Sequence, residues 1–180
     1  MSKYLNNLIG LTLFLTVFNV KAENLYQNKY IDTNKKQIDF SDYRGQVIMI
    51  VNIATRCGYT GQLDDLEKLY QKYQSKNFKI LGFPSNEFGE QTPESSHEVG
   101  NFCRLKYGVT FPIIEKQTIL GKKKTSIYKW LNAQEGHESE VKWNFEKFII
   151  GKDGKIKGHF LSEIEPMNSR ITSLIEKNLN

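Results

Sequence analysis

The sequence is poor in the residues that most often bind metals or exchange disulfides. It has only two cysteines, Cys57 and Cys103, and they lie too far apart to form a Cys-x-x-Cys motif. The three histidines are scattered, and none stands at metal-ligand spacing with a cysteine: His97, His137 and His159. We therefore expect no metal site and no bound cofactor. The missing motif also counts against a thioredoxin-type dithiol centre.

The chain also lacks a strong net charge and a long hydrophobic run. A formal net charge of +5 is too small to indicate nucleic-acid binding. The one tight basic run, residues 122–124, is typical of a solvated loop. The main apolar stretch, residues 8–18, is shorter than the ~18 residues that a membrane-spanning helix needs. With no internal repeat or linker, the chain is expected to fold as one domain.

The N-terminus has the pattern of a secretory signal peptide. A positive residue, Lys3, precedes the apolar stretch, and small residues at the end of the segment 20–22 fit a signal-peptidase site. We predict cleavage after Ala22, which leaves a mature domain of residues 23–180 exported to the periplasm. Cleavage removes two lysines and lowers the formal charge to +3. A retained membrane anchor is the alternative, whereas lipid attachment is not expected because no cysteine lies near the cut.

Hydrophobic periodicity predicts the elements of the first half of the domain. Two nearly continuous apolar runs, residues 47–53 and 78–83, are typical of strands that are buried on both faces. Apolar residues recur between them at helical spacing: Leu63, Leu66, Leu69, Tyr70 and Tyr73. We expect a second helix to start with Thr92 as its cap and Pro93 in its first position. One side of that helix carries Val99, Phe102 and Cys103.

The remaining elements complete a recognisable order. They are a hairpin over residues 31–40, an extended segment over 111–114, a short helix over 126–131, and strands 145–150 and 156–160 around an Asp-Gly turn. A last helix is expected to begin at Pro166. Its inward-facing side chains are expected to be Met167, Ile171, Leu174 and Ile175. A βαβ unit followed by a ββα unit predicts an α/β, thioredoxin-like fold, in which helices flank both faces of a central mixed β-sheet.

Cys57 occupies the redox position of that fold, after the first core strand and before the first long helix. The free N–H groups and the positive dipole end of a helix favour the thiolate form of a cysteine placed there. A thiolate, and not a thiol, attacks peroxides and disulfides. We therefore expect an exposed, ionised sulfur at position 57.

Three separated blocks of sequence carry a family resemblance. They read NIATRCGYT over residues 52–60, FPSNEFGEQ over 83–91 and KWNFEKF over 142–148. Together, in this order and spacing, they closely resemble the signature blocks of the glutathione peroxidase family, and the resemblance runs from about Leu25 to the C-terminus. It is closest to the bacterial two-cysteine members that use thioredoxin and carry a signal peptide.

The resemblance implies a role for each matching residue. Cys57 matches the peroxidatic position, which holds selenocysteine in some members. Gln91, Trp143 and Asn144 match the other three residues of the catalytic tetrad. Cys103 matches the resolving cysteine, which would close a disulfide with the oxidised Cys57. A further cysteine found in some relatives is absent here, since Ser85 stands in its place.

The residue types suit this chemistry. The thiolate of Cys57 would attack a peroxide and become a sulfenic acid, while water or an alcohol leaves. The amide of Gln91 and the indole N–H of Trp143 are neutral donors that would stabilise the thiolate and the leaving oxygen, and Asn144 would add a third. Removal of one such donor typically lowers a rate by ~100- to 1,000-fold.

Regeneration and assembly follow from the resemblance alone. It implies a peroxide substrate, a role in the response to oxidative stress, and a thioredoxin-like protein or glutathione as reductant. Only a short segment separates Leu131 from Trp143, so that the insertion of tetrameric relatives is lacking and a monomer is expected. Because a disulfide needs Cα atoms within ~7 Å, we expect the Cys103 helix to unwind for the pairing. Gly100 would weaken that helix.

Two other readings stay open from the sequence. One is an exported thiol–disulfide oxidoreductase that does not use peroxide. The other is a non-catalytic binding module that holds a structural disulfide between Cys57 and Cys103, as exported proteins with two cysteines often do.

Overall fold

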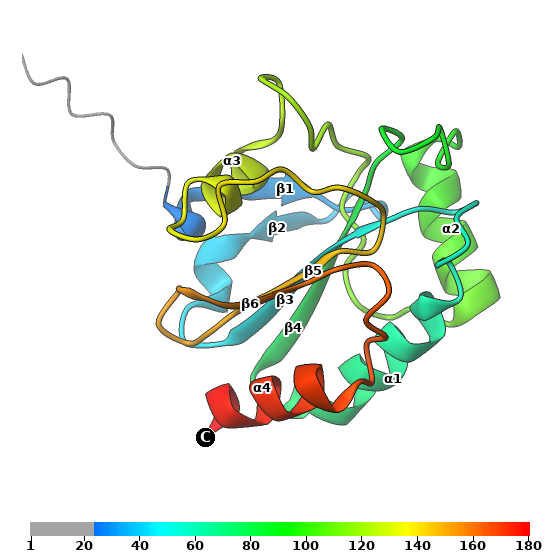
Figure 1. Ribbon diagram of the computed structural model, residues 1–180. Coiled ribbons are helices and arrows are strands. Elements are labelled where there is room, and N and C mark those ends of the chain that lie inside the picture. Colours follow the sequence, from blue (N-terminus) through cyan, green and yellow to red (C-terminus); the bar gives the residue numbers. More distant parts are fainter. Residues whose placement is uncertain (1–23) are drawn as a thin grey trace, which may run out of the picture.

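The computed structural model describes residues 24–180, which form a four-stranded mixed sheet with helices on both faces (Figure 1). The predicted signal peptide, its cleavage site and the alternative membrane anchor lie outside the described residues. Within residues 24–180, no helix is long and apolar enough to cross a membrane. The predicted thioredoxin-like class of fold is confirmed by this sheet and by the structural comparisons given below.

The sheet has the strand order β4-β3-β5-β6. β3 (Val47–Ile53) pairs in parallel with β4 (Phe78–Pro84) and antiparallel with β5 (Lys147–Ile150), which in turn pairs antiparallel with β6 (Ile156–Phe160). β3 and β6 have the predicted bounds. β5 starts two residues later than predicted, because Phe145 adopts a left-handed backbone with φ of 65° and cannot belong to a strand.

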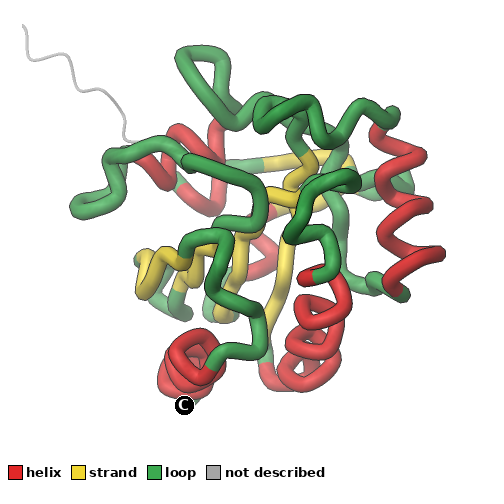
Figure 2. Tube along the Cα trace, turned by 45° about the vertical axis from the view of Figure 1, so that its right-hand side comes forward, coloured by secondary structure: helices red, strands yellow, loops and turns green. Residues whose placement is uncertain are grey.

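Each face of the sheet has its own apolar core, and β3 contributes to both. Alternate side chains of β3, such as Met49 and Val51, pack with residues of α1 (Gln62–Tyr73) and α4 (Ser169–Leu179). The side chains between them pack with α3 (Ser126–Asn132) and with the hairpin of β1 (Lys29–Ile31) and β2 (Gln37–Asp39). Burial on both faces explains why β3 is continuously apolar. Figure 2 shows α4, which ends at the C-terminus, on the same side of the sheet as α1.

The extended segment and the short helix are present where the sequence predicts them, and the hairpin spans residues 29–39 instead of 31–40. Residues 111–114 run beside β4 and are joined to it through a parallel bridge between Gly82 and Ile113. The turn between β5 and β6 is closed by Gly151 and Gly154, as its Asp-Gly sequence predicts. Three short 3-10 helices complete the described chain: Leu25–Gln27, Phe40–Tyr43 and Gln74–Lys76.

The predicted start of the second helix was wrong. α2 (Ser96–Tyr107) begins after Ser95, whose side chain accepts from the Glu98 N–H, while Glu98 accepts from the Ser95 N–H. This reciprocal capping box satisfies two free N–H groups, whereas Thr92 offers one cap oxygen. Thr92 is instead fully buried, and its N–H donates to Asn86 Oδ1 at 2.8 Å.

The predicted start of the last helix was also wrong. α4 begins at Ser169 and not at Pro166, because Asn168 caps it and accepts from the Arg170 N–H at 2.9 Å. Met167 therefore precedes the helix and is exposed, contrary to prediction. Ile171 and Ile175 are buried as predicted, and Leu174 is half-buried against the same core.

The structure gives Gly100 a packing role that the sequence did not suggest. A Cβ atom at this position of α2 would lie 2.6 Å from Cβ of Thr33 and would overlap its Oγ1 as well. Thr33 is buried in the turn of the β1–β2 hairpin, and its Oγ1 accepts from Arg104 at 3.2 Å. A glycine therefore allows α2 to lie close against the hairpin.

We expect Gly100→Ala to lower the free energy of unfolding by about 1–2 kcal/mol. Alanine gains about 1 kcal/mol of helix propensity, but the overlap with Thr33 costs about 1–3 kcal/mol and lies at the upper end of that range. Urea denaturation of the reduced protein measures the change.

Gly61→Ala is the matched control, because Gly61 has an ordinary backbone conformation and open space around its Cβ position. It should leave stability unchanged or raise it slightly. Equal stability of Gly100→Ala and wild type would show that Thr33 moves aside at no cost.

Candidate active site

Cys57 lies in a tight turn between β3 and α1. Its N–H donates to Thr60 Oγ1 at 2.9 Å, and the Thr60 hydroxyl donates to Ala54 O at 3.0 Å. These two hydrogen bonds hold residues 54–60 in one conformation. Cys57 is only 9% exposed, between the exposed residues Arg56 and Gly58. The expectation of an exposed sulfur was therefore wrong, since the turn folds over the thiol and leaves only a small part open.

A turn amide, and not the first turn of a helix, reaches the sulfur. The N–H of Tyr59 points to Cys57 Sγ at 3.5 Å, and no other hydrogen bond to Sγ occurs within residues 24–180. α1 begins only at Gln62. One backbone donor thus stands ready to stabilise negative charge on sulfur.

The backbone of Gln91 is bound directly to the Cys57 loop. The N–H groups of Thr55 and Arg56 both donate to Gln91 O, at 3.2 and 3.0 Å. This pair of bonds joins the end of the 83–91 block to the residues just before the cysteine. The sequence predicts that the 52–60 and 83–91 blocks act together. The structure shows that these two segments, which are distant in sequence, are in contact.

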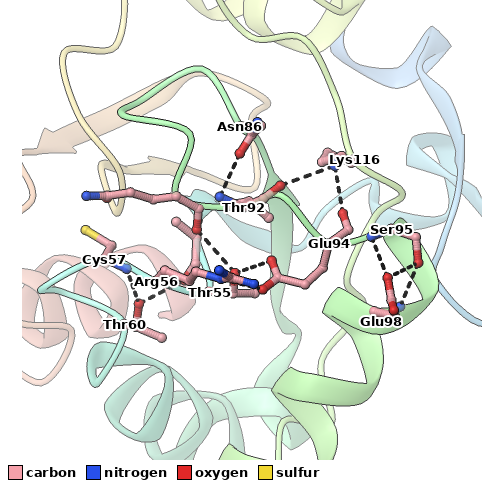
Figure 3. A network of polar contacts seen from close by, with 12 residues as sticks. Thr55, Arg56, Cys57, Thr60, Asn86, Thr92, Glu94, Ser95, Glu98 and Lys116 are labelled. Carbon is pink, nitrogen blue, oxygen red and sulfur yellow. Dashed lines mark hydrogen bonds and ion pairs between the residues drawn. The ribbon is translucent and has the colours of Figure 1, made fainter.

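A carboxylate reinforces that junction (Figure 3). Glu94 accepts from the Thr55 hydroxyl at 2.6 Å and pairs with Arg56 at 2.8 Å. Lys116 donates to the backbone oxygens of Glu94 and Thr92, at 2.7 and 3.2 Å. Burial tends to raise the pKa of Glu94, but the bonds from Thr55 and Arg56 outweigh it and hold that pKa below its usual value. Glu94 is therefore ionised at neutral pH. Cys57 points its sulfur away from this network in Figure 3.

Asn52 fixes the third block to the end of β3. Its side chain donates to Trp143 O at 2.9 Å and accepts from the Glu146 N–H at 3.0 Å, while its own backbone oxygen accepts from the Phe145 N–H at 2.7 Å. Asn52 is fully buried. An amide that makes all these bonds in an apolar core holds the turn of residues 142–146 in one place.

Glu146 closes the same turn from the inside. One carboxylate oxygen accepts from the N–H groups of Lys142 and Trp143, at 2.7 and 3.1 Å, and the other contacts His159 Nε2 at 2.7 Å. His159 stacks on Phe148, with ring centroids 4.0 Å apart. The turn that carries Trp143 and Asn144 is therefore anchored to both β3 and β6.

The side chains of Gln91 and Asn144 meet. Asn144 Nδ2 donates to Gln91 Oε1 at 3.0 Å, and Asn144 is fully buried. Trp143 is 40% exposed and packs on Phe88, with ring centroids 5.8 Å apart. Neither Gln91 Nε2 nor Trp143 Nε1 donates a hydrogen bond within the described part of the chain, and neither is bonded to Sγ. Both N–H donors thus remain available.

Backbone strain occurs next to these two residues, at two of the four non-glycine residues with positive φ among residues 24–180. Glu90 and Phe145, which adjoin Gln91 and Asn144, have left-handed φ angles of 52° and 65°. Each such conformation costs about 1–3 kcal/mol for a residue other than glycine. In addition, Asn144 Oδ1 is buried with no hydrogen-bond partner among residues 24–180. Strain and an unpaired acceptor at one place are typical of a functional site.

Cys103 lies within α2 and is fully buried, and both cysteines are free. Burial raises the pKa of the Cys103 thiol to about 12, although the charge of Arg104 lowers it in part. The thiol is therefore un-ionised at neutral pH. Cys57 and Cys103 belong to the same apolar core.

Sequence reasoning missed three residues that organise the site: Asn52, Glu94 and Glu146. Asn52 did leave a signal, since it is the only polar residue in the strand 47–53, and a buried amide needs partners. Glu94 and Glu146 read as ordinary surface acids because their partners are distant in sequence.

Comparison with known proteins points to one family. The family profile described as "Glutathione peroxidase" matches residues 25–132. The chain is 41% identical over 160 residues to "Glutathione peroxidase-like peroxiredoxin 2" of Saccharomyces cerevisiae, which covers 86% of this chain and 98% of that protein. It is 38% identical over 156 residues to a "Glutathione peroxidase" of Lactococcus lactis, with 84% and 99% covered.

Solved structures give the same answer for the fold. The crystal structure of Trgpx in its apo form has a TM-score of 0.69 and 35% identity, and covers 88% of this chain and 96% of that one. A thioredoxin-family thiol:disulfide interchange protein from Chlorobium tepidum, with a TM-score of 0.62, 15% identity and 85% and 93% covered, shares the fold alone. The chain therefore belongs to the glutathione peroxidase family.

Proposed function

We propose that the protein is a thiol peroxidase that reduces hydrogen peroxide and organic hydroperoxides at Cys57 and serves in the response to oxidative stress. The observation that supports this most is the junction of three segments: Gln91 is bound through its backbone to the Cys57 loop and through its side chain to Asn144. The relatives named as peroxidases and peroxiredoxins support the same chemistry.

The first step is attack of the Cys57 thiolate on one peroxide oxygen. An S–O bond forms and the O–O bond breaks, so that sulfur becomes a sulfenic acid and the second oxygen leaves with the bonding electrons. That oxygen must gain a proton to leave as water or an alcohol. Gln91 Nε2 is fixed as a donor because its Oε1 is already bonded to Asn144, and Trp143 Nε1 is free. We assign both to the stabilisation of the leaving oxygen.

The second step is resolution by Cys103. Its sulfur attacks the sulfenic sulfur, an S–S bond forms, and water leaves. A thiol reductant then restores both cysteines by disulfide exchange. Because the Cys103 thiol is buried and un-ionised in the folded state, α2 must open before this attack. We propose a thioredoxin-like protein as the reductant, with glutathione as the alternative that a direct comparison tests.

The setting of the protein belongs to the same proposal. Residues 1–22 would be a signal peptide of a bacterial protein, and the mature domain would act in the periplasm as a monomer. Residues 133–146, between α3 and β5, form no helix or strand, which is consistent with the lack of an oligomerisation insertion. Nothing in the described residues favours the binding module with a fixed disulfide, since both cysteines are free.

Peroxide should oxidise Cys57 in a single fast step. We expect Cys57→Ser to abolish the reaction with hydrogen peroxide, and Gln91→Ala to lower its second-order rate constant by ~100-fold, since it removes a donor to the leaving oxygen. Stopped-flow measurement of thiol loss in the reduced protein gives these rates.

Gln134→Ala is the control. Gln134 is a half-buried glutamine that follows α3, and its side chain makes one hydrogen bond, to Trp130 O of that helix. It should react like wild type. A wild-type rate no greater than that of free cysteine would refute the peroxidase assignment.

The two cysteines should differ strongly in reactivity. At pH 7 we expect iodoacetamide to label Cys57 more than about tenfold faster than Cys103, because the buried thiol at position 103 is un-ionised. Peptide mapping by mass spectrometry measures the labelling at each site.

After one equivalent of peroxide, both cysteines should resist the reagent because they form a disulfide. In Cys103→Ser, dimedone should instead trap a lasting sulfenic acid on Cys57. Unchanged turnover of Cys103→Ser with a thioredoxin would exclude Cys103 as the resolving residue.

A further inference from the structure

A loop outside the three signature blocks contacts the Asn144 turn. The hydroxyl of Ser162 donates to Asn144 O at 2.6 Å. Ser162 follows β6 and is 5% exposed. Asn144 is thus held at two atoms, since its side chain donates to Gln91 and its backbone oxygen accepts from Ser162.

The same loop is bonded to the start of α1. Gln62 Nε2 donates to Ser162 O at 2.7 Å, and Gln62 is the first residue of the helix that follows the Cys57 turn. Ser162 therefore connects two elements of the site through its two oxygen atoms. One bond leads to the turn of Trp143 and Asn144, and the other leads to the helix next to Cys57.

A buried lysine keeps this loop in place. Lys147 on β5 is fully buried, and its Nζ donates to Ser162 O at 3.3 Å and to Ile164 O at 2.6 Å. Within residues 24–180, no carboxylate lies within ion-pair distance of Nζ. Burial lowers the pKa of Lys147 to about 8, although the nearby charges of Glu165, Glu163 and Glu146 raise it in part. A buried charge without an acidic partner is costly to fold, so its retention needs an explanation.

We propose that Ser162 is a positioning residue of the active site, and that Lys147 and Gln62 hold its loop against the Asn144 turn. This inference rests on the peroxidase function proposed above. Ser162 acts through Asn144, which in turn orients the amide of Gln91 toward the leaving oxygen. The strained φ of 65° at Phe145, the next residue, shows that this turn does not adopt its shape unaided.

Ser162→Ala tests the proposal, since it removes one hydroxyl and adds no bulk. We expect the rate of thiol loss with hydrogen peroxide to fall by about 10- to 100-fold, because a small misplacement of a catalytic group has an effect of this size. In ¹⁵N-labelled protein, the side-chain amide resonances of Gln91 and Asn144 should also shift. Lys147→Met should lower the same rate, because its loop loses the Nζ hydrogen bonds.

Ser126→Ala is the control, because its hydroxyl bonds to Asn28 and Tyr30 beside the core on the other face of the sheet. It should leave the rate and both amide resonances unchanged. Equal rates and unshifted amide resonances in Ser162→Ala and wild type would overturn the positioning role. A wild-type protein that fails to react with peroxide would instead refute the proposed function, and the amide shifts would still report on the contact.

Discussion

One hydrogen bond, from Asn144 Nδ2 to Gln91 Oε1, closes the candidate active site, and the surrounding structure makes it possible. A bond of this kind contributes only about 0.5–1.5 kcal/mol, which is too little to hold two strained segments together. Hydrogen bonds at and just after the carboxyl end of β3 hold the two segments in place. Asn52 fixes the Asn144 turn there, and the N–H groups of Thr55 and Arg56 fix Gln91. Because β3 is buried on both faces and closely packed, it holds these bonding groups in a fixed position.

The proposed catalytic cycle requires a rigid turn around Cys57 and a movement of the helix that carries Cys103. The Cys57 turn is closed by Thr60 and joined to Glu94, so that it can present its sulfur in one geometry. α2 must open to release Cys103, yet it is capped at Ser95 and lies tightly against Thr33. The close packing at Gly100 is therefore lost when the helix unwinds. Local opening of α2 would break that contact while the sheet stays intact.

Much of the fold could be predicted from the sequence because its signals are local. The apolar run of β3 and the spacing of Leu63, Leu66 and Leu69 fix elements without reference to distant residues. Errors arose where two local signals competed. Thr92 and Pro93 resemble a helix start, but the capping box of Ser95 and Glu98 satisfies more backbone groups. Pro166 likewise resembles a first helical residue, but the helix begins after Asn168, whose side chain accepts from the Arg170 N–H.

The site was only partly predictable. Motifs pointed to Cys57, Gln91, Trp143 and Asn144, and the structure joins Gln91 to the Cys57 loop and to Asn144. Among the residues that support them, Asn52 left a signal as the one polar residue of its strand. Glu146 and Ser162 left none, because their partners are set by tertiary packing. The low exposure of Cys57 was missed since it depends on how the turn folds over the sulfur.

A double-mutant cycle on Gln91→Ala and Asn144→Ala tests most directly whether the two amides act as a unit. The measured quantity is the second-order rate constant for thiol loss with hydrogen peroxide. If Asn144 works by orienting Gln91, the double variant should react about as slowly as Gln91→Ala alone, with a coupling of about 0.5–3 kcal/mol. Losses that multiply across the cycle would contradict this account and show that the two residues act independently.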